Sequence, residues 1–376
     1  DAGMLKNAFL AGAKGLEANK EWINELNVFP VPDGDTGTNM TMTILSAARE
    51  VAAVENPTME ALARAISSGS LRGARGNSGV ILSQLFRGFT KEIKTVDVIT
   101  TSVLSDAFNR ATETAYKAVM KPKEGTILTV ARGCAEAAVR LAEETDEIEV
   151  FLKGIIEDGH KVLAQTPEML PVLKQAGVVD AGGRGLLYIL EGALKQMGGD
   201  LPVVLQENQN TAAPEMNFAS LASVENESIT FGYCTEFFIN VDHADEGVTT
   251  ALKAYLGTIG DSIVCVADDD IIKIHVHTDH PGLAIEKALT IGSLSGLKID
   301  NMREEHREVL ALKNEETASD IQEEVAPAES KKYAFISVAM GDGITRVLKD
   351  LGVDYVIEGG QTMNPSTQDM MECISK

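Results

Sequence analysis

One stretch of the chain, NVFPVPDGDTGTNM at residues 27–40, indicates both the fold and the chemistry. Two carboxylates, Asp33 and Asp35, flank a glycine between a proline-stiffened approach and a helix predicted to begin near Thr38. Magnesium prefers oxygen ligands, and the free N–H groups of a helix N-terminus favour anions. Pro-Asp-Gly alone is more simply a turn. Two Asp, two Gly, two Thr and one Asn within residues 33–39 instead indicate a site for magnesium and phosphate.

Two further loops place small residues and backbone donors in front of predicted helices. They are RGARGNSG at residues 72–79 and GVVDAGGRG at residues 177–185. Each loop alone fits a glycine-rich turn that lets two helices pack closely, and no Walker lysine accompanies either. Three such loops at the same type of boundary favour phosphate binding over packing alone.

Outside these loops, residues 1–200 carry apolar side chains at helical spacing, and few alternating β-branched runs interrupt them. This pattern predicts one all-α domain of about eight helices in an antiparallel bundle. The helices are predicted over residues 4–26, 38–54, 58–71, 78–94, 102–120, 125–144, 148–165, 168–176 and 182–198.

The remaining residues predict a multidomain chain with two linkers. Residues 201–226 and the acidic stretch 313–332 lack bulky apolar periodicity and are predicted to be linkers. Between them, residues 227–312 predict a small α/β middle domain, with strands at 229–241, 261–267 and 271–277 and helices at 247–259 and 282–289. Residues 333–376 predict the incomplete start of a further α/β domain, with strands at 333–339 and 354–357 and a helix at 344–351.

A second group of chemically active residues lies in the middle domain. His275 and His277 alternate along a predicted strand, so both imidazoles lie on one face. Cys234 on a neighbouring strand would complete a zinc site of three ligands with an open fourth position. The alternatives are ordinary polar alternation for the histidines and a buried thiol for the cysteine. Weaker candidates for a fourth ligand are His243, Asp279 and His280.

Composition excludes several classes of protein. A net charge of −23 and the absence of a Lys/Arg cluster argue against nucleic acid as a partner. No uninterrupted apolar run is long enough for a membrane span. Four scattered cysteines and the lack of a secretory signal predict a cytoplasmic protein without a disulfide framework. A first residue other than Met and an unfinished C-terminal fold suggest a fragment.

The segments PDGDTGTNM, GARGNSG, EGTIL and GVVDAGGRG, in that order, resemble the nucleotide-binding subunit of dihydroxyacetone kinases over residues 1–200. The resemblance implies an eight-helix barrel that binds ADP and two magnesium ions, with Asp33 and Asp35 as catalytic metal ligands. That family has a third aspartate before the pair, and Asn27 stands at about that distance here. The residues that would contact or border the nucleotide are Thr36, Gly37, Thr38, Asn39, Asn77, Ser78, Thr126, Asp180 and Gly182.

The whole chain resembles the ATP-binding subunit of bacterial fatty acid kinase. The resemblance rests on the helical domain followed by GYCTE at 232–236, KIHVHTD at 273–279, the acidic linker and GGQTMNPST at 359–367. It implies zinc at Cys234, His275 and His277, and a C-terminal domain that engages a fatty-acid-binding carrier protein of the DegV type.

The predicted reaction is attack of a fatty acid carboxylate on the γ-phosphate of ATP to give an acyl phosphate. Arg75 or Arg184 would add positive charge, although both are equally suited to surface ion pairs. Two alternatives stay open: a kinase of dihydroxyacetone or a related triose, and a regulator that binds nucleotide and zinc without turnover. The faces of either domain would also allow a homodimer.

Overall fold

The structure, a computed structural model, describes residues 1–198, 230–304, 335–339, 345, 348 and 351–358. Contacts divide the chain into one unit over Asp1–Lys313 and a second over Asn314–Lys376. Both predicted linkers, the GGQTMNPST segment and most of the predicted helix at 344–351 lie outside the described residues.

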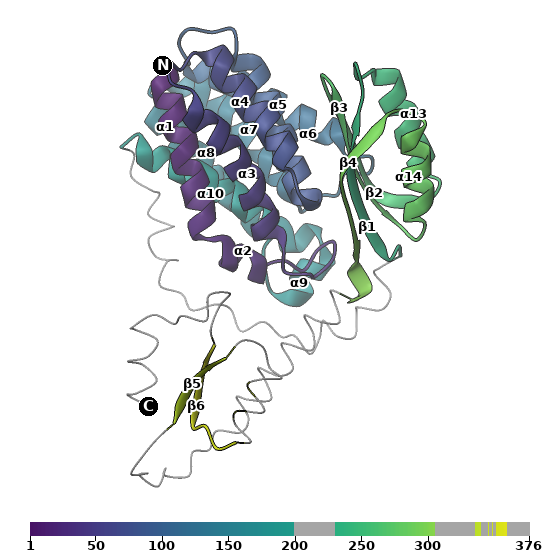
Figure 1. Ribbon diagram of the computed structural model, residues 1–376. Helices are drawn as coiled ribbons and strands as arrows, with labels where there is room; N and C mark the ends of the chain where they lie inside the picture. Colours follow the sequence, from purple (N-terminus) through teal and green to yellow (C-terminus); the bar gives the residue numbers. More distant parts are fainter. Residues whose placement is uncertain (199–229, 305–334, 340–344, 346–347, 349–350, 359–376) are drawn as a thin grey trace. The chain divides into compact units, whose positions relative to one another are not determined.

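The first 198 residues form a helical barrel, as predicted (Figure 1). Eight long helices pack in a closed ring in which α1 follows α10, and the prediction of an all-α domain of about eight helices is confirmed. Two six-residue helices, α2 and α9, lie in the connections. The helices are α1 (Ala2–Ala18), α2 (Lys20–Glu25), α3 (Thr36–Ala53), α4 (Met59–Gly73), α5 (Gly76–Ile93), α6 (Thr101–Ala118), α7 (Ile127–Glu144), α8 (Ile148–Met169), α9 (Pro171–Ala176) and α10 (Ala181–Gln196).

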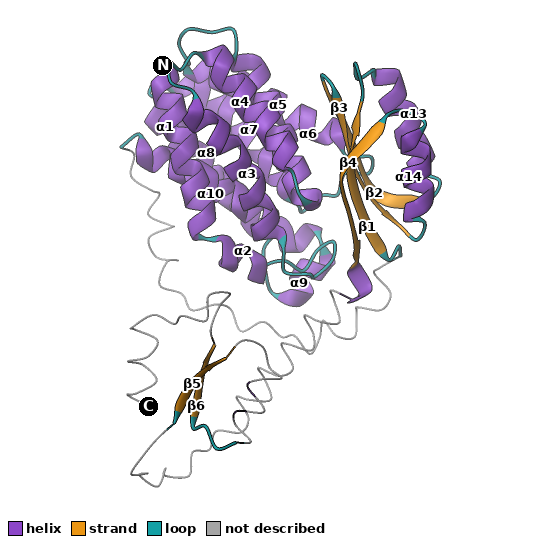
Figure 2. Cartoon of the chain, viewed as in Figure 1, coloured by secondary structure: helices purple, strands orange, loops and turns teal. Residues whose placement is uncertain are grey.

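The ring places four helix N-termini at one end of the barrel. Short connections make each long helix antiparallel to its neighbour, so α3, α5, α7 and α10 all begin at the same end (Figure 2). The three glycine-rich loops predicted from the sequence therefore lie at this end, together with the loop before α7. Each N-terminus carries backbone donors without a partner in their own helix backbone, and the positive end of a helix dipole.

The prediction of one continuous helix over residues 4–26 was wrong. The structure breaks it at Asn19, which separates α1 from α2 with φ −113° and ψ 15°. The Asn19 side chain donates to Gly15 O at 2.8 Å, an alternative to the helical backbone pattern that asparagine readily offers. The break turns α2 beneath the start of α3, which matters for the site described below.

Close helix packing depends on Gly88, where α5 crosses α6. A Cβ atom on Gly88 would come within 2.3 Å of Arg110 O and 2.5 Å of Ala111 Cα, both backbone atoms. We therefore expect Gly88→Ala to lower the free energy of unfolding by about 1–3 kcal/mol despite alanine's higher helix propensity. Gly282→Ala in a helix of the middle domain is the control, because nothing lies within 4 Å of its added Cβ. Equal urea midpoints for the two variants would contradict this packing.

The barrel interior is apolar and carries a cavity of its own. Phe9 packs edge-on against Phe86, and Phe89 packs edge-on against Phe108, all four lining this cavity. None of the residues around the cavity belongs to the polar pocket described below. The cavity is thus part of the barrel core, separate from the site.

The middle domain is a four-stranded antiparallel sheet with two helices. The strands are β1 (Tyr233–Asn240), β2 (Gly260–Asp268), β3 (Ile271–Thr278) and β4 (Ser293–Asn301), in the spatial order β2-β3-β1-β4. Three strands and both helices, α13 (Glu246–Leu256) and α14 (Pro281–Leu289), correspond to predicted elements. Sequence reasoning missed β4, whose side chains are mostly exposed and show little apolar alternation.

The two faces of this sheet differ in chemistry. Phe237, Ile274 and Val276 pack with Leu252 of α13 and Ala284 of α14 in an apolar core. α13 and α14 lie together on one side of the sheet (Figure 1). The opposite face carries the polar residues of β1, β3 and β4 that alternate with this core.

The sheet contacts the helical barrel directly within the first unit. Val264 and Val266 of β2 join an apolar cluster with Leu71, Val80 and Ala118 of the barrel. Two polar contacts also join the barrel to β2. Ser68 donates to Asp268 at 3.2 Å, and Arg87 donates to the carbonyl of Ala267. The barrel and the middle domain thus share one packed interface.

The second unit is described only in part. Its strands β5 (Ile336–Ala339) and β6 (Tyr355–Glu358) pair in parallel, in agreement with the two strands predicted there. None of the helices in the described part of the chain combines the length and the hydropathy that a membrane span requires.

Candidate functional site

The loop between α2 and α3 is built around a buried asparagine. Asn27 donates to Val31 O at 2.9 Å and to Asp33 Oδ1 at 2.7 Å, and it accepts a hydrogen bond from Thr36. Gly34 has φ +69°, a conformation that glycine adopts without strain. The loop thereby presents Asp33 and Asp35 to one pocket, which Asn27 also lines.

The start of α3 rests on the short helix α2. Thr38 N donates to Asn24 Oδ1 at 3.0 Å, and a Cβ on Gly37 would lie 2.1 Å from Lys20 O. Of the predicted phosphate contacts in this segment, Thr36 and Asn39 line the pocket, while Gly37 and Thr38 pack towards α2.

The starts of α3 and α5 lie side by side. Asn39 donates to Asp35 Oδ2 at 2.6 Å, and a Cβ on Gly76 would lie 2.5 Å from Asn39 Nδ2. Gly76 has φ +56°, and Asn77 and Ser78 follow it into the pocket. Two helix N-termini and two carboxylates thus converge, an arrangement suited to phosphate and its cation.

The polar face of the middle-domain sheet completes the same pocket. Cys234 pairs with His277 across β1 and β3, and Glu236 pairs with His275. On the other side of β1, Lys298 and Asp300 of β4 lie opposite Glu236 and Cys234. All six side chains line the pocket with Asp33 and Asp35. The two groups of residues that the sequence suggested separately therefore form one site.

Buried charges on the sheet balance one another. Burial acts to raise the pKa of the Glu236 carboxyl, but hydrogen bonds from His275 and Lys273 hold that pKa far below its usual range. Burial acts to lower the pKa of His275, yet the Cys234 sulfur and Glu236 raise it. Burial and the neighbouring His275 lower the pKa of His277 to about 3. The cluster thus shifts the pKa values of the two imidazoles in opposite directions, and a metal ion bound at either ring would compete with a proton there.

The donor set of Cys234, His275 and His277 fits a zinc ion. One ligand atom from each residue lies within 4.8 Å of the other two. His275 Nε2 is buried and has no hydrogen-bond partner among the described residues. Thiolate and imidazole are ordinary zinc ligands, and three protein ligands leave the fourth position open, as in catalytic zinc sites.

The predicted fourth ligands lie elsewhere. Asp279 accepts from Gly232 N at 2.8 Å and lies 3.5 Å from Arg303. His280 is the residue before α14, and His243 follows β1 in an exposed loop. None of the three lines the pocket.

The remaining predicted nucleotide residues lie at the starts of α7 and α10. Asp180 precedes α10, accepts from Gly183 N at 2.6 Å and is 6% exposed. Thr126 precedes α7, and a Cβ on Gly182 would lie 3.2 Å from Ile127 Cβ. These residues lie at the N-termini of α7 and α10, at the same end of the barrel as those of α3 and α5. They do not line the pocket that contains Asp33 and Asp35.

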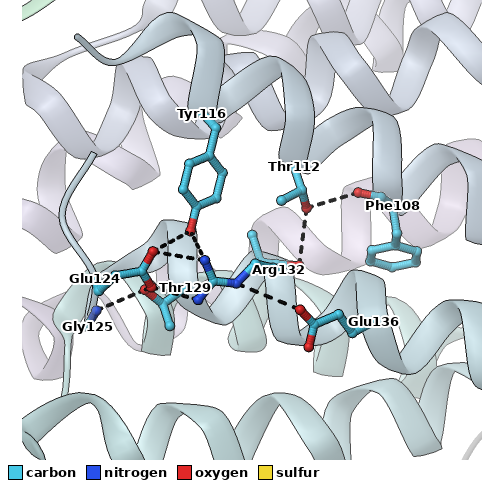
Figure 3. Close-up of polar contacts among 9 residues, drawn as sticks. Phe108, Thr112, Tyr116, Glu124, Gly125, Thr129, Arg132 and Glu136 are labelled. Atoms are coloured by element: carbon cyan, nitrogen blue, oxygen red, sulfur yellow. Dashed lines mark hydrogen bonds and ion pairs between the residues drawn. The ribbon is translucent and has the colours of Figure 1, made fainter. Parts of the chain in front are cut away.

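An ionic network fixes the loop before α7 (Figure 3). Glu124 receives two hydrogen bonds from Arg132, at 2.8 and 2.7 Å, and one from Thr129 at 2.9 Å. Gly125 N in turn donates to Thr129 Oγ1 at 2.9 Å. Tyr116 joins Arg132 at 3.1 Å. The backbone next to Thr126 is thereby held in place by side chains of α6 and α7.

Arg184 and Arg75 were the predicted extra cations. Arg184 binds Glu191 at 2.7 Å and stacks 3.7 Å over the Tyr188 ring, so its charge is used within α10. Arg75 precedes α5 and donates its backbone N–H to Thr43. Neither arginine lines the pocket. The cation in the pocket wall is instead Lys298, whose Nζ lies 2.5 Å from Asp300 Oδ2.

The buried Asp180 carboxyl should make the free energy of unfolding depend on pH. Burial raises the pKa of its carboxyl from 3.8 to about 7, with backbone N–H groups of Gly183 and Ile127 opposing the shift. The folded state therefore retains a proton that the unfolded chain releases, and the stability from Asp180 is lost as pH rises from about 4 to about 7. The difference in unfolding free energy between wild type and Asp180→Asn should fall by up to about 1.4 kcal/mol per pH unit there. Urea unfolding across that range checks this, and parallel curves would contradict it.

Sequence reasoning missed Glu236, Lys273, Lys298 and Asp300. Glu236 and Lys273 stood within the quoted motifs GYCTE and KIHVHTD, at alternate positions from Cys234 and His275. That alternation could have placed them on the metal face. Lys298 and Asp300 could not be placed because β4 was not predicted.

Comparisons with known proteins agree with this architecture. Three family models match the chain: the DAK2 domain at residues 30–195, the middle domain of the FakA-like fatty acid kinase family at 230–309, and the C-terminal domain of the same FakA-like family at 334–376. Protein SH1689 of Staphylococcus haemolyticus (strain JCSC1435) is 43% identical over 377 residues, covering 99% of this chain and 67% of the relative. Protein YloV of Bacillus subtilis (strain 168) is 41% identical over 381 residues, covering 100% of this chain and 68% of the relative.

The chain thus spans about two thirds of these relatives. Among solved structures, that of dihydroxyacetone kinase from C. freundii in complex with AMP-PNP and Mg²⁺ is similar with a TM-score of 0.41 and 15% identity. The similarity covers 52% of this chain and 34% of that chain.

Proposed function

Because the chain belongs to the family of DAK2-domain kinases with FakA-like middle and C-terminal domains, we propose that it phosphorylates a fatty acid carboxylate with ATP. The product is an acyl phosphate, and the acid is presented by a DegV-like carrier protein. The supporting observation is the single pocket that joins Asp33 and Asp35 to the start of α5 and to the Cys234–His275–His277 cluster.

The chemical step is a transfer between two anions. A carboxylate oxygen forms a bond to the γ-phosphorus while the bond to the oxygen shared with the β-phosphate breaks, and ADP leaves with that electron pair. A carboxylic acid with a pKa of about 4–5 is already ionised at neutral pH, so no general base is required. The barrier is the repulsion between the two anions.

The residues of the pocket would reduce the repulsion between the two anions. Asp33 and Asp35 would hold Mg²⁺, whose charge neutralises the phosphates when it is bound. The helix dipoles at the starts of α3 and α5 would add fixed partial positive charge beside the same anions. Asn39 and Asn77 supply amide groups beside them.

The sheet side of the pocket would receive the acyl group. Cys234, His275 and His277 would hold Zn²⁺, which supplies a Lewis-acidic position for a carboxylate oxygen. Lys298 adds an ammonium group to the pocket wall. This placement sets an acceptor site opposite the phosphate site, across one pocket.

The function is tested by measuring ATP consumption with magnesium while a fatty-acid-loaded carrier is added or withheld, with dihydroxyacetone in parallel. We expect ADP and acyl phosphate to appear only with the loaded carrier. Turnover with dihydroxyacetone would instead make the protein a triose kinase. Nucleotide binding without turnover on either acceptor would make it a regulator.

A further inference from the structure

Glu236 connects the metal cluster to the phosphate loop. Its Oε1 accepts from the backbone N–H of Gly76 at 2.7 Å and lies 2.7 Å from His275 Nδ1. Its Oε2 accepts from Lys273 Nζ at 3.0 Å. One carboxylate on β1 therefore contacts both β3 and the first residue of α5.

The burial of this carboxylate makes its contacts strong and specific. Glu236 is 2% exposed and Lys273 is 1% exposed, so both charges are removed from water. A buried ion pair is costly unless its hydrogen bonds are all made, and truncation of one partner leaves an uncompensated charge. A purely structural ion pair would require only Lys273, whereas Glu236 also directs one oxygen to His275 and Gly76.

The contacts continue on the helical side. Gly76, with φ +56°, packs closely on the Asn39 side chain, since an added Cβ would lie 2.5 Å from Asn39 Nδ2. Asn39 in turn donates to Asp35 Oδ2 at 2.6 Å. An unbroken series of direct contacts thus runs from His275 through Glu236, Gly76 and Asn39 to Asp35.

We propose that Glu236 is a positioning residue that couples metal binding at Cys234, His275 and His277 to nucleotide binding at Asp35 and Gly76–Ser78. This inference rests on the proposed function, because it takes the pocket to hold Mg·nucleotide and zinc. A carboxylate that receives the Nδ1 proton of a metal-bound histidine fixes the ring, and the ring fixes the carboxylate. The same carboxylate rotamer holds the Gly76 N–H, so ordering of either site lowers the entropic cost of ordering the other.

The coupling is reciprocal by thermodynamic necessity. We expect Mg·ADP to tighten Zn²⁺ binding by about tenfold, and Zn²⁺ to tighten Mg·ADP binding by the same factor. The Kd of Zn²⁺ is measured by chelator competition with and without saturating Mg·ADP. The Kd of Mg·ADP is measured by calorimetry on metal-loaded and metal-stripped protein.

Two variants separate coupling through Glu236 from direct attraction between the metal and the phosphates. Glu236→Asp keeps a negative charge beside Lys273 but is shorter by about 1.5 Å, so it cannot span both contacts. Glu236→Met combined with Lys273→Met keeps a side chain of similar length but removes both buried charges and both acceptor oxygens together. We expect each to bind both ligands with a coupling factor near one, and circular dichroism confirms that they are folded.

Glu191→Gln is the matched control, because Glu191 is also a buried carboxylate, 2.8 Å from His160, but lies in α10 outside the pocket. It should retain the full coupling factor. An unchanged factor in the folded Glu236 variants, independent binding in the wild type, or absence of Zn²⁺ binding would each overturn the proposal. Failure of the proposed function gives a different result: the coupling factor stays intact, but no carrier-dependent turnover is measured.

Discussion

Asp35→Asn should lower magnesium-dependent ATP turnover by about 10²–10³-fold while the helical barrel stays folded. Asp35 is partly exposed in the pocket and receives a hydrogen bond from Asn39 at 2.6 Å. The amide keeps the shape and a carbonyl oxygen for Asn39 but removes the charge that a magnesium ion requires. The loss should therefore fall on turnover and on nucleotide affinity in the presence of magnesium, rather than on stability.

Stopped assays of ADP production with and without magnesium measure this effect. Asp106→Asn on the exposed face of α6 is the matched control and should behave as wild type. Asp33→Asn should act in the same direction, with an added local effect because Asp33 Oδ1 accepts from Asn27 at 2.7 Å. Near-normal turnover in folded Asp35→Asn protein would remove the metal assignment from this loop.

Much of the helical domain could be predicted from local patterns. Helical periodicity gave the long helices, because amphipathic spacing reports the buried face of each helix directly. The break at Asn19 escaped that pattern, since apolar spacing continues across it through Leu16 and Ile23. The helix ends there because the Asn19 side chain donates a 2.8 Å hydrogen bond to Gly15 O. The spacing of apolar residues carries no information about such a bond.

The candidate site was predicted as two separate halves. Each half lies within a short stretch of sequence, so spacing and residue type were sufficient to suggest it. Their union depends on contacts such as Gly76 with Glu236 and Ser68 with Asp268, between residues 160 and 200 positions apart. The packing of a sheet against a helical barrel cannot be seen in the local pattern of one sequence. The role of Glu236 could therefore be recognised only from the structure.

β4 illustrates a further limit of pattern reading. It is an outer strand of the sheet, and Leu297 and Ile299 remain 50% and 45% exposed. An edge strand with glycine inside it and exposed apolar residues lacks the alternation that marks a half-buried strand. Consequently Lys298 and Asp300, the pocket residues that this strand contributes, could not be proposed beforehand.

Cys234→Ser should abolish stoichiometric zinc binding. The thiolate is the strongest of the three candidate ligands, and a hydroxyl that stays protonated at neutral pH cannot replace it. We expect an affinity loss of at least about 100-fold, since changes even to residues that merely orient zinc ligands cost about 10–100-fold. Metal analysis of the purified protein should find one zinc per wild-type chain and almost none in the variant.

The control for this prediction is Cys265→Ser, because Cys265 is buried in the apolar core on the other face of the sheet. Its zinc content should equal that of the wild type, although its stability should fall. Carrier-dependent turnover then distinguishes what the ion does. If zinc orients the acyl carboxylate, turnover is lost in Cys234→Ser while Mg·ADP still binds. If the variant loses zinc and keeps full turnover, the ion is structural, and Lys298 with the helix N-termini must receive the acyl carboxylate without it.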